Sequence, residues 1–197
     1  MARWEAEPKE RLARAALDLF ADKGYDSTTV ADIVERAGLT KSTFFRHFTD
    51  KREVLFAGQD DLVSVLTGAV TAVPAPAGQA PVRYVEALLS ALANQFSVEA
   101  LVLGAKRAAV VSAHPDLRER DLLKRAQLVA ALEHALNVRG VADVGARLAA
   151  TVAVMAFDIA LDRWATGAGA DAFGDLLTGA LQELVDRAGS LGQPLRR

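Results

Sequence analysis

Apolar residues recur at spacings of three and four along almost the whole chain, and no segment shows the alternation of a half-buried strand. Leu12, Ala16 and Phe20 show this spacing close to the N-terminus. They follow Pro8, a residue that is well tolerated in the first turn of a helix. Because the same period continues to the last segments, the pattern predicts an all-α protein.

Glycines and hydroxyl residues mark the ends of the expected short helices. Gly24 and Gly38 follow apolar segments, where a left-handed glycine closes a helix. Threonines and Asp50 precede the next segments and can cap free N–H groups. We expect helices after Pro8, from near Ser27–Thr29, after Thr40, and from Thr49–Asp50 to about Val70. The longer helices are expected at Pro81–Phe96, Val98–Ser112, Pro115–Asn137, Ala142–Thr166 and Asp171–Ala188.

Composition excludes several classes of protein. The chain has no cysteine, which removes thiolate metal sites and cysteine nucleophiles. Its three histidines do not pair at helical spacing and no glycine-rich phosphate loop is present, so we expect no catalytic residue, metal site or cofactor. The longest uncharged stretch, Leu62 to Val82, holds three prolines and predicts no membrane span. We therefore expect a soluble, cytoplasmic, non-enzymatic protein.

The segment Thr28–Lys51 has the layout of a helix-turn-helix, with two short helices joined through Gly38. Ile33, Val34 and Phe44 can fill the helix crossing, which frees one face of the second of these helices. Residues 36–56 hold five basic side chains against two acidic ones, although the whole chain has a net charge of −2. These features favour DNA binding, and an ordinary helical hairpin with a solvated face is the alternative.

A longer pattern carries a family resemblance. The run AALDLFADKGYDSTTV (15–30), followed by DIVERAGLTKSTFFRHF (32–48), Asp50-Lys51 and Val54-Leu55, resembles the N-terminal signature of the TetR family of transcriptional repressors. The remaining two thirds resemble the family in length and helix order. The resemblance implies a nine-helix, two-domain architecture, with a DNA-binding domain at 1–55 and a ligand-binding and dimerisation domain at 56–197.

The resemblance also implies which residues meet DNA. In such regulators the third helix enters the major groove, so Lys41, Ser42 and Thr43 are expected near base edges. Phe45 stands where a tyrosine is usual; it cannot donate to a phosphate, which leaves apolar contact with a sugar or a thymine methyl group. The full expected DNA-binding set is Thr28, Thr29, Thr40, Lys41, Ser42, Thr43, Phe45, Arg46, His47 and Lys51.

By the same resemblance, the second domain binds a small apolar effector and forms a homodimer through the last two helices. The expected effector-binding residues are Tyr84, Leu88, Leu92, Phe96, Val102, Met155, Phe157 and Asp158. A helical apolar stripe is also what an ordinary core requires. The segments His114–Arg118 and Ala160–Trp164 are similar to acyl-CoA-sensing members, which implies a long-chain acyl-CoA with Lys106, Arg107 or Arg118 near its phosphates.

Together these features predict a ligand-responsive, sequence-specific transcriptional regulator that is released from operator DNA by its effector. Two alternatives stay open at this point: an architectural DNA-binding protein without a ligand, and an activator of the same fold. The large, slightly acidic second part argues against the architectural alternative, because such proteins distribute basic residues widely.

Overall fold

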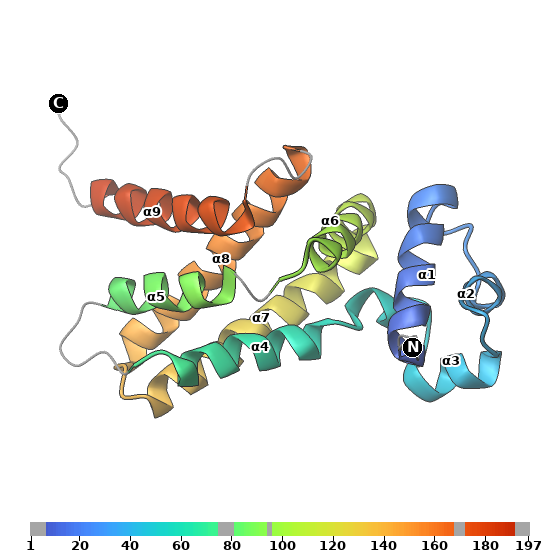
Figure 1. Cartoon of the computed structure of the whole chain (residues 1–197), viewed down its shortest axis with the longest axis horizontal. Helices are drawn as coiled ribbons and strands as arrows, with labels where there is room; N and C mark the ends of the chain where they lie inside the picture. The colour runs from blue at the N-terminus through green and yellow to red at the C-terminus, as the bar shows by residue number, and fades with distance from the viewer. Residues whose placement is uncertain (1–6, 75–80, 94–95, 168–171, 192–197) are drawn as a thin grey trace, which may run out of the picture. The chain divides into compact units, whose positions relative to one another are not determined.

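The computed structural model describes residues 7–74, 81–93, 96–167 and 172–191, which form nine α-helices and one 3₁₀ helix without a β-strand (Figure 1). The all-α prediction is thus confirmed. The chain divides into an N-terminal unit (1–60 with 102–121) and a C-terminal unit (61–101 with 122–197). The boundaries fall inside α4 (Gln59–Ala72), α6 (Val98–Ala113) and α7 (Pro115–Val138). The functional boundary expected at residue 55 stays a prediction.

The N-terminal unit is built around α1 (Pro8–Lys23), which packs against α2 (Val30–Ala37), α3 (Lys41–His47) and the 3₁₀ helix η1 (Glu53–Phe56) (Figure 1). Its core contains the side chains expected at the helix crossing, and Ile33 and Phe44 are fully buried. The same core includes Val110, Val111 and Leu117 from α6 and α7. The helix-turn-helix is therefore supported by residues about 60 positions further along the chain.

The turn between α2 and α3 requires a glycine at position 38. Gly38 is left-handed, with φ 64° and ψ 37°. Its N–H donates to the carbonyl of Glu35 at 3.1 Å, and the N–H of Leu39 donates to that of Val34 at 2.8 Å. A Cβ at position 38 would also lie 3.3 Å from Nη2 of Arg11, which donates to the carbonyl of Ala37 at 2.6 Å. This closed turn fixes the angle between the two helices.

The expected helix from Thr49–Asp50 to Val70 was wrong at its start. Asp50 does cap a turn, because its Oδ1 accepts from the N–H groups of Arg52 and Glu53 at 2.7 and 3.1 Å. The turn continues as η1, and α4 begins only at Gln59. All three apolar residues of η1, Val54, Leu55 and Phe56, are buried. Consecutive residues of a 3₁₀ helix point about 120° apart, so the burial of all three means that the core of the N-terminal unit surrounds η1 on every side.

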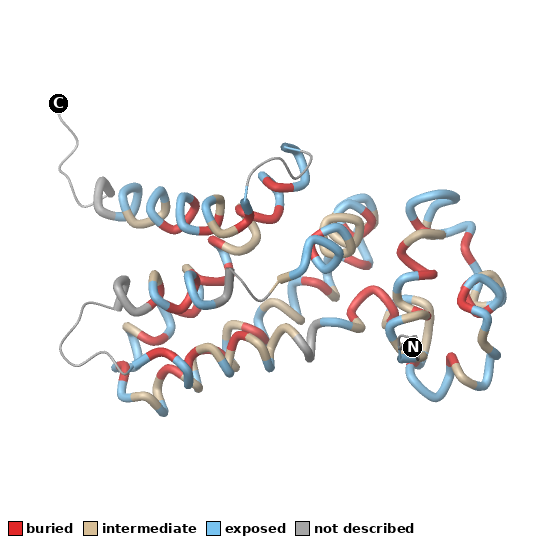
Figure 2. The backbone as a smooth tube through the Cα atoms, in the orientation of Figure 1, coloured by how far each residue is buried: buried red, intermediate tan, exposed pale blue. Residues whose placement is uncertain are grey.

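The C-terminal unit is built around α8 (Asp143–Thr166), which packs against α5 (Pro81–Ala93) and α9 (Phe173–Leu191). One face of α8 is buried, and Figure 2 colours buried segments red. This face includes the small residues Ala146, Ala149, Ala150 and Ala153. Small side chains allow neighbouring helices to approach closely. At another point of this unit, Nη2 of Arg139 donates to the carbonyl of Val73 at 2.7 Å and joins the end of α7 to the end of α4.

By length and composition α8 is the one helix of the described residues that could also cross a membrane. A core helix passes the same test, and the contacts of α8 are those of a core helix. Its alanine-rich face is buried, and Asp158 forms an ion pair with Arg125. Arg163 of α8 pairs with Glu183 of α9 at 2.6 Å. Packing within the C-terminal unit therefore accounts for the buried face of α8.

Candidate nucleic-acid interface

The third helix is fixed to the core by one face. Phe44 is 0% exposed, and its ring lies 5.6 Å from that of Phe48, which is also buried. At the start of α3, the hydroxyl of Thr40 accepts from the N–H of Thr43 at 3.1 Å, and the two hydroxyls lie 3.0 Å apart. This N-cap satisfies a backbone donor that the helix itself leaves free. The buried Phe residues and the cap thus hold a helix of only two turns in a defined orientation.

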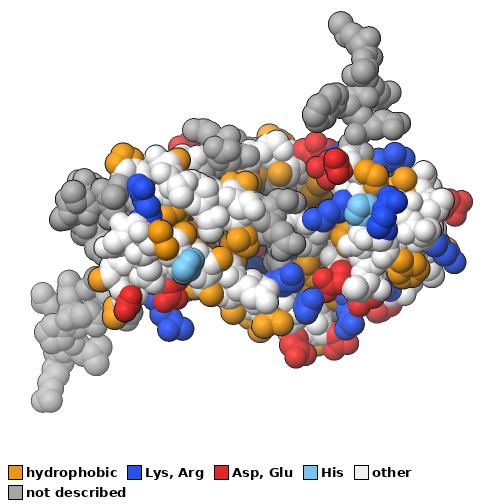
Figure 3. Space-filling model, turned by 90° about the horizontal axis from the view of Figure 1, so that it is seen from below, with side chains coloured by type: hydrophobic (Ala, Val, Ile, Leu, Met, Phe, Trp, Pro, Cys, Tyr) orange, Lys and Arg blue, Asp and Glu red, His pale blue; other side chains and the backbone are white. Residues whose placement is uncertain are grey.

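The opposite face of α3 is exposed and carries cations. Four side chains are exposed on one side of this helix, at spacings that follow the helical turn: Lys41, Ser42, Phe45 and Arg46. Within the described residues, no hydrogen bond or ion pair engages the side-chain polar groups of Lys41, Ser42 or Arg46. The right half of Figure 3 shows the N-terminal unit. There, basic side chains (blue) lie on both sides of a histidine (pale blue), with hydrophobic side chains (orange) beside them. These side chains are free to donate to an external acceptor such as a phosphate or a base edge.

Thr43 and His47 lie beside that face rather than on it. Thr43 is half-buried and belongs to the cap, while His47 is exposed with its ring 6.4 Å from that of Phe48. The expected α3 residues are therefore brought together on one short helix. The contacts that they make with DNA stay a prediction.

The start of α2 is closed by a capping box. The hydroxyl of Thr29 accepts from the N–H of Asp32 at 3.2 Å, and the carboxylate of Asp32 accepts from both the N–H and the hydroxyl of Thr29 at 2.7 Å. Lys23, at the end of α1, lies 2.7 Å from the same carboxylate. Lys23 and Thr29 together hold the pKa of Asp32 well below its usual range. The exposed Thr29 thus already uses its side chain within the protein.

We expect the capping box to make stability depend on acid pH. The folded-state pKa of Asp32 is lowered, so its contribution is complete above the ordinary aspartate pKa and is lost as pH falls below about 4. The melting temperature of Asp32→Asn should therefore fall less steeply than that of wild type between about pH 4 and pH 2. Glu35→Gln removes a carboxylate from the same helix without touching the box and serves as the control. Parallel curves for Asp32→Asn and wild type would contradict this role.

Thr28 and Lys51 of the expected DNA-binding set hold the loop between α1 and α2 through their side chains. Thr28 is 1% exposed, and its hydroxyl donates to the carbonyl of Gly24 at 2.8 Å. Nζ of Lys51 donates to the carbonyls of Tyr25 and Thr28 at 2.8 and 3.0 Å and lies 4.2 Å from the centre of the Tyr25 ring. Lys51 therefore fixes the loop between α1 and α2. Sequence spacing could not indicate this, because the two bonds join residues 26 and 23 positions apart.

Replacing Lys51 by methionine keeps the aliphatic stem and removes the ammonium. We expect a loss of about 1–3 kcal/mol in the free energy of unfolding, since two charge-assisted hydrogen bonds and a cation–π contact disappear. Urea denaturation measures this loss. Lys41→Met, on the exposed face of α3, is the matched control and should leave stability almost unchanged. Equal stability of the two variants would show that the Lys51 bonds contribute nothing.

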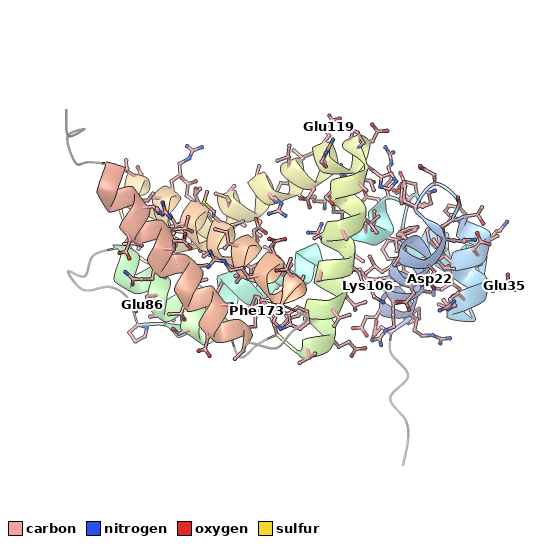
Figure 4. The ribbon with its side chains drawn as sticks, turned by 90° about the horizontal axis from the view of Figure 1, so that it is seen from above. Asp22, Glu35, Glu86, Lys106, Glu119 and Phe173 are labelled. Atoms are coloured by element: carbon pink, nitrogen blue, oxygen red, sulfur yellow. The ribbon has the colours of Figure 1, made fainter. Side chains whose placement is uncertain are left out.

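Ion pairs attach α6 and α7 to the rest of the N-terminal unit. Lys106 of α6, labelled in Figure 4, pairs with Asp18 of α1 at 2.6 Å, and Arg120 of α7 pairs with Glu53 of η1 at 2.6 Å. Arg107 pairs with Asp121 at 2.7 Å. Lys106 and Arg107 were expected near the phosphates of an acyl-CoA, and both instead have carboxylate partners within their own unit. The partners lie up to 88 residues away in sequence, so no local pattern could have indicated these pairs.

The expected effector-binding residues are only partly brought together. Phe96 and Phe157 lie 5.1 Å apart between ring centres. Both also contact Phe173, which is labelled in Figure 4 and was not among the expected effector-binding residues. Leu88 is buried in α5, while Asp158 is paired with Arg125. Met155 and Val102 are exposed, and Val102 belongs to the other unit. The side chains of Tyr84 and Leu92 lie outside the described residues. A function for this set as an effector site stays a prediction.

An apolar stripe on α8 faces away from the buried alanines. Val144, Leu148 and Met155 are exposed and follow one another at intervals of four and seven residues, which places them on one side of a helix. On α9 the apolar residues Phe173, Leu177, Ala180 and Leu181 are buried within the chain. In the single chain the apolar stripe of α8 is thus exposed, whereas these apolar residues of α9 are buried.

A buried scaffold that presents an exposed, basic helix after a glycine turn defines a helix-turn-helix domain. The family model described as "Bacterial regulatory proteins, tetR family" matches residues 12–57. Residues 12–57 thus belong to the tetR family, and the described part of the chain has the fold of TetR-family regulators.

Relatives and solved structures agree with this assignment. The chain is 36% identical over 75 residues to the HTH-type transcriptional regulator TcmR of Streptomyces glaucescens, a match that covers 38% of this chain and 32% of TcmR. A structure from Syntrophomonas wolfei, assigned to the TetR-family transcriptional regulators, matches with a TM-score of 0.64 at 15% identity over 97% of this chain and 98% of that one. Thermus thermophilus FadR, a TetR-family repressor in complex with lauroyl-CoA, matches with a TM-score of 0.54 at 23% identity over 96% of each chain.

Proposed function

We propose that this chain is a cytoplasmic, ligand-responsive transcriptional repressor that binds operator DNA as a homodimer. The observation that carries the proposal is the exposed face of α3, where Lys41, Ser42 and Arg46 are unengaged on a helix held by the buried Phe44. A recognition helix needs such a rigid support and free donors. The match of residues 12–57 to the tetR family supports the same assignment.

The proposed DNA-facing set is Thr40, Lys41, Ser42, Thr43, Phe45, Arg46 and His47, with Thr29 at the start of α2. We assign Thr28 and Lys51 to the support of this set, because neither is exposed and both hold the loop between α1 and α2 through bonds to its carbonyls. Thr29 and Thr40 cap their helices at exposed positions and stay in the proposed set. The support also includes the ion pairs of Asp18 and Glu53 to α6 and α7.

We propose a small apolar effector that binds in the C-terminal unit, with long-chain acyl-CoA as the first class to test. The lauroyl-CoA bound to FadR of Thermus thermophilus supports this choice, as does the apolar cluster of Phe96, Phe157 and Phe173. Three helices, α4, α6 and α7, contain residues of both compact units. A ligand that favours one arrangement of these helices can therefore bias the DNA-binding unit, and a coupling of about 1–3 kcal/mol weakens operator binding about 5–150-fold.

The proposal is tested with the full chain and fluorescent DNA. Selection from a random duplex library, together with DNA from upstream of the protein's own gene, identifies bound sequences, and a scrambled duplex is the control. Fluorescence anisotropy should show preferred, salt-dependent binding that weakens when oleoyl-CoA or another apolar compound is added. Equal weak binding to all duplexes would overturn sequence-specific recognition and favour an architectural protein. Specific binding that no compound weakens would overturn the proposed effector class.

A further inference from the structure

Phe45 is exposed in a way that the other phenylalanines of the chain are not. All eight belong to the described residues, and the other seven are buried or half-buried, whereas Phe45 is 58% exposed. An exposed aromatic ring leaves a large apolar area in contact with water, and burying it against another molecule is favourable. The residues around Phe45 on α3 indicate which kind of molecule this ring contacts.

The exposed ring of Phe45 contacts the buried ring of Phe44. Its centre lies 5.3 Å from that of Phe44, with an angle of 81° between the ring planes. This edge-to-face contact is a preferred aromatic geometry, and Phe44 is itself fully buried. Phe45 therefore loses little conformational freedom when it contacts a ligand, which is a favourable property for recognition.

The neighbours of Phe45 are polar and cationic. Lys41 and Ser42 precede it by four and three positions on the same helical face, and Arg46 follows it, all exposed. An apolar ring framed by cations suits a surface that is anionic at its edges and apolar at one point. Duplex DNA offers this combination in the major groove, where phosphates border the groove and the apolar group is the thymine 5-methyl.

We propose that Phe45 is a specificity-determining residue that contacts the 5-methyl group of one thymine in each operator half-site. This inference rests on the proposed function and deepens it. Because the ring has no hydroxyl, its contribution is apolar, and the transfer of one methyl group out of water corresponds to an affinity difference of about 4-fold per half-site. Two half-sites occupied by a dimer give about 15-fold.

Deoxyuridine tests the contact, since it pairs like thymidine and lacks only the methyl group. From an operator selected by wild-type full-length protein, each thymine is replaced by deoxyuridine at symmetric positions, and affinities are measured by fluorescence anisotropy. One symmetric pair should weaken wild-type binding about 15-fold. The same replacement should leave Phe45→Ala binding unchanged, while the other thymine positions behave alike in both proteins. This double-mutant comparison isolates the contact between ring and methyl group.

Lys41→Ala is the matched control on the same face. It should weaken binding to every duplex, lower the salt dependence and retain the full deoxyuridine effect. A selected operator at which no deoxyuridine effect disappears in Phe45→Ala would overturn the inference, even if Phe45→Ala binds all duplexes less tightly, as a sugar contact would predict. A wild-type protein that selects no sequence would overturn the proposed function and this inference with it.

Discussion

Phe44→Ala is expected to lower the free energy of unfolding of the N-terminal unit far more than any substitution on the neighbouring surface. The Phe44 side chain is 0% exposed and contacts the rings of Phe45 and Phe48. Replacing it leaves a cavity beneath α3 that a helix of only two turns cannot close. A buried phenylalanine replaced by alanine costs about 3–5 kcal/mol, which is a large part of the stability of a small domain.

The adjacent residue provides an unusually close control. Phe45→Ala makes the same chemical change one position later at an exposed site, so its effect on stability should stay within about 0.5 kcal/mol. Urea denaturation of the full chain measures both variants, and hydrogen exchange of the α3 amides locates the loss in Phe44→Ala to the N-terminal unit. Similar stabilities of the two variants would mean that Phe44 is not the residue that anchors the helix. The comparison thus tests which aromatic side chain supports the fold and which is available for DNA.

Local sequence signals predicted the helices and the turn of the helix-turn-helix well, because each of these features depends on neighbouring residues. A glycine with positive φ at position 38, the N-cap at Thr40 and the burial of Phe44 and Phe48 are of this kind. Apolar periodicity shows which face of a helix is buried. It does not show which other helix covers that face, so the sequence could not predict how the helices pack against one another.

Long-range contacts account for what was missed. Val110, Val111 and Leu117 join the core of the N-terminal unit, and Lys106 pairs with Asp18 across 88 residues of sequence. The family resemblance implies a phosphate contact for Lys51, and its ammonium also donates to two carbonyls within the chain. A charge pattern indicates that a cation is present and cannot indicate what its nearest acceptor is.

The second large effect is expected from a charge placed on the exposed stripe of α8. Leu148 is 57% exposed and lies between Val144 and Met155 on the face opposite the buried alanines. If this stripe forms the proposed homodimer interface, Leu148→Glu must bury a carboxylate without a partner, which is strongly unfavourable. The dimer should dissociate at micromolar concentration, and sedimentation velocity measures the change in mass.

Dissociation has a direct consequence for operator binding. A dimer binds its second half-site as an intramolecular event, which increases affinity about 10²–10⁴-fold over a single DNA-binding unit. Leu148→Glu should lose this gain although its α3 residues are untouched. Val138→Glu, at a similarly apolar, 73% exposed position on α7, is the control and should remain dimeric with wild-type affinity. A monomeric Leu148→Glu protein with unchanged affinity would show that one unit suffices for operator binding. A Leu148→Glu protein that stays dimeric would show that the chains associate through a surface other than α8.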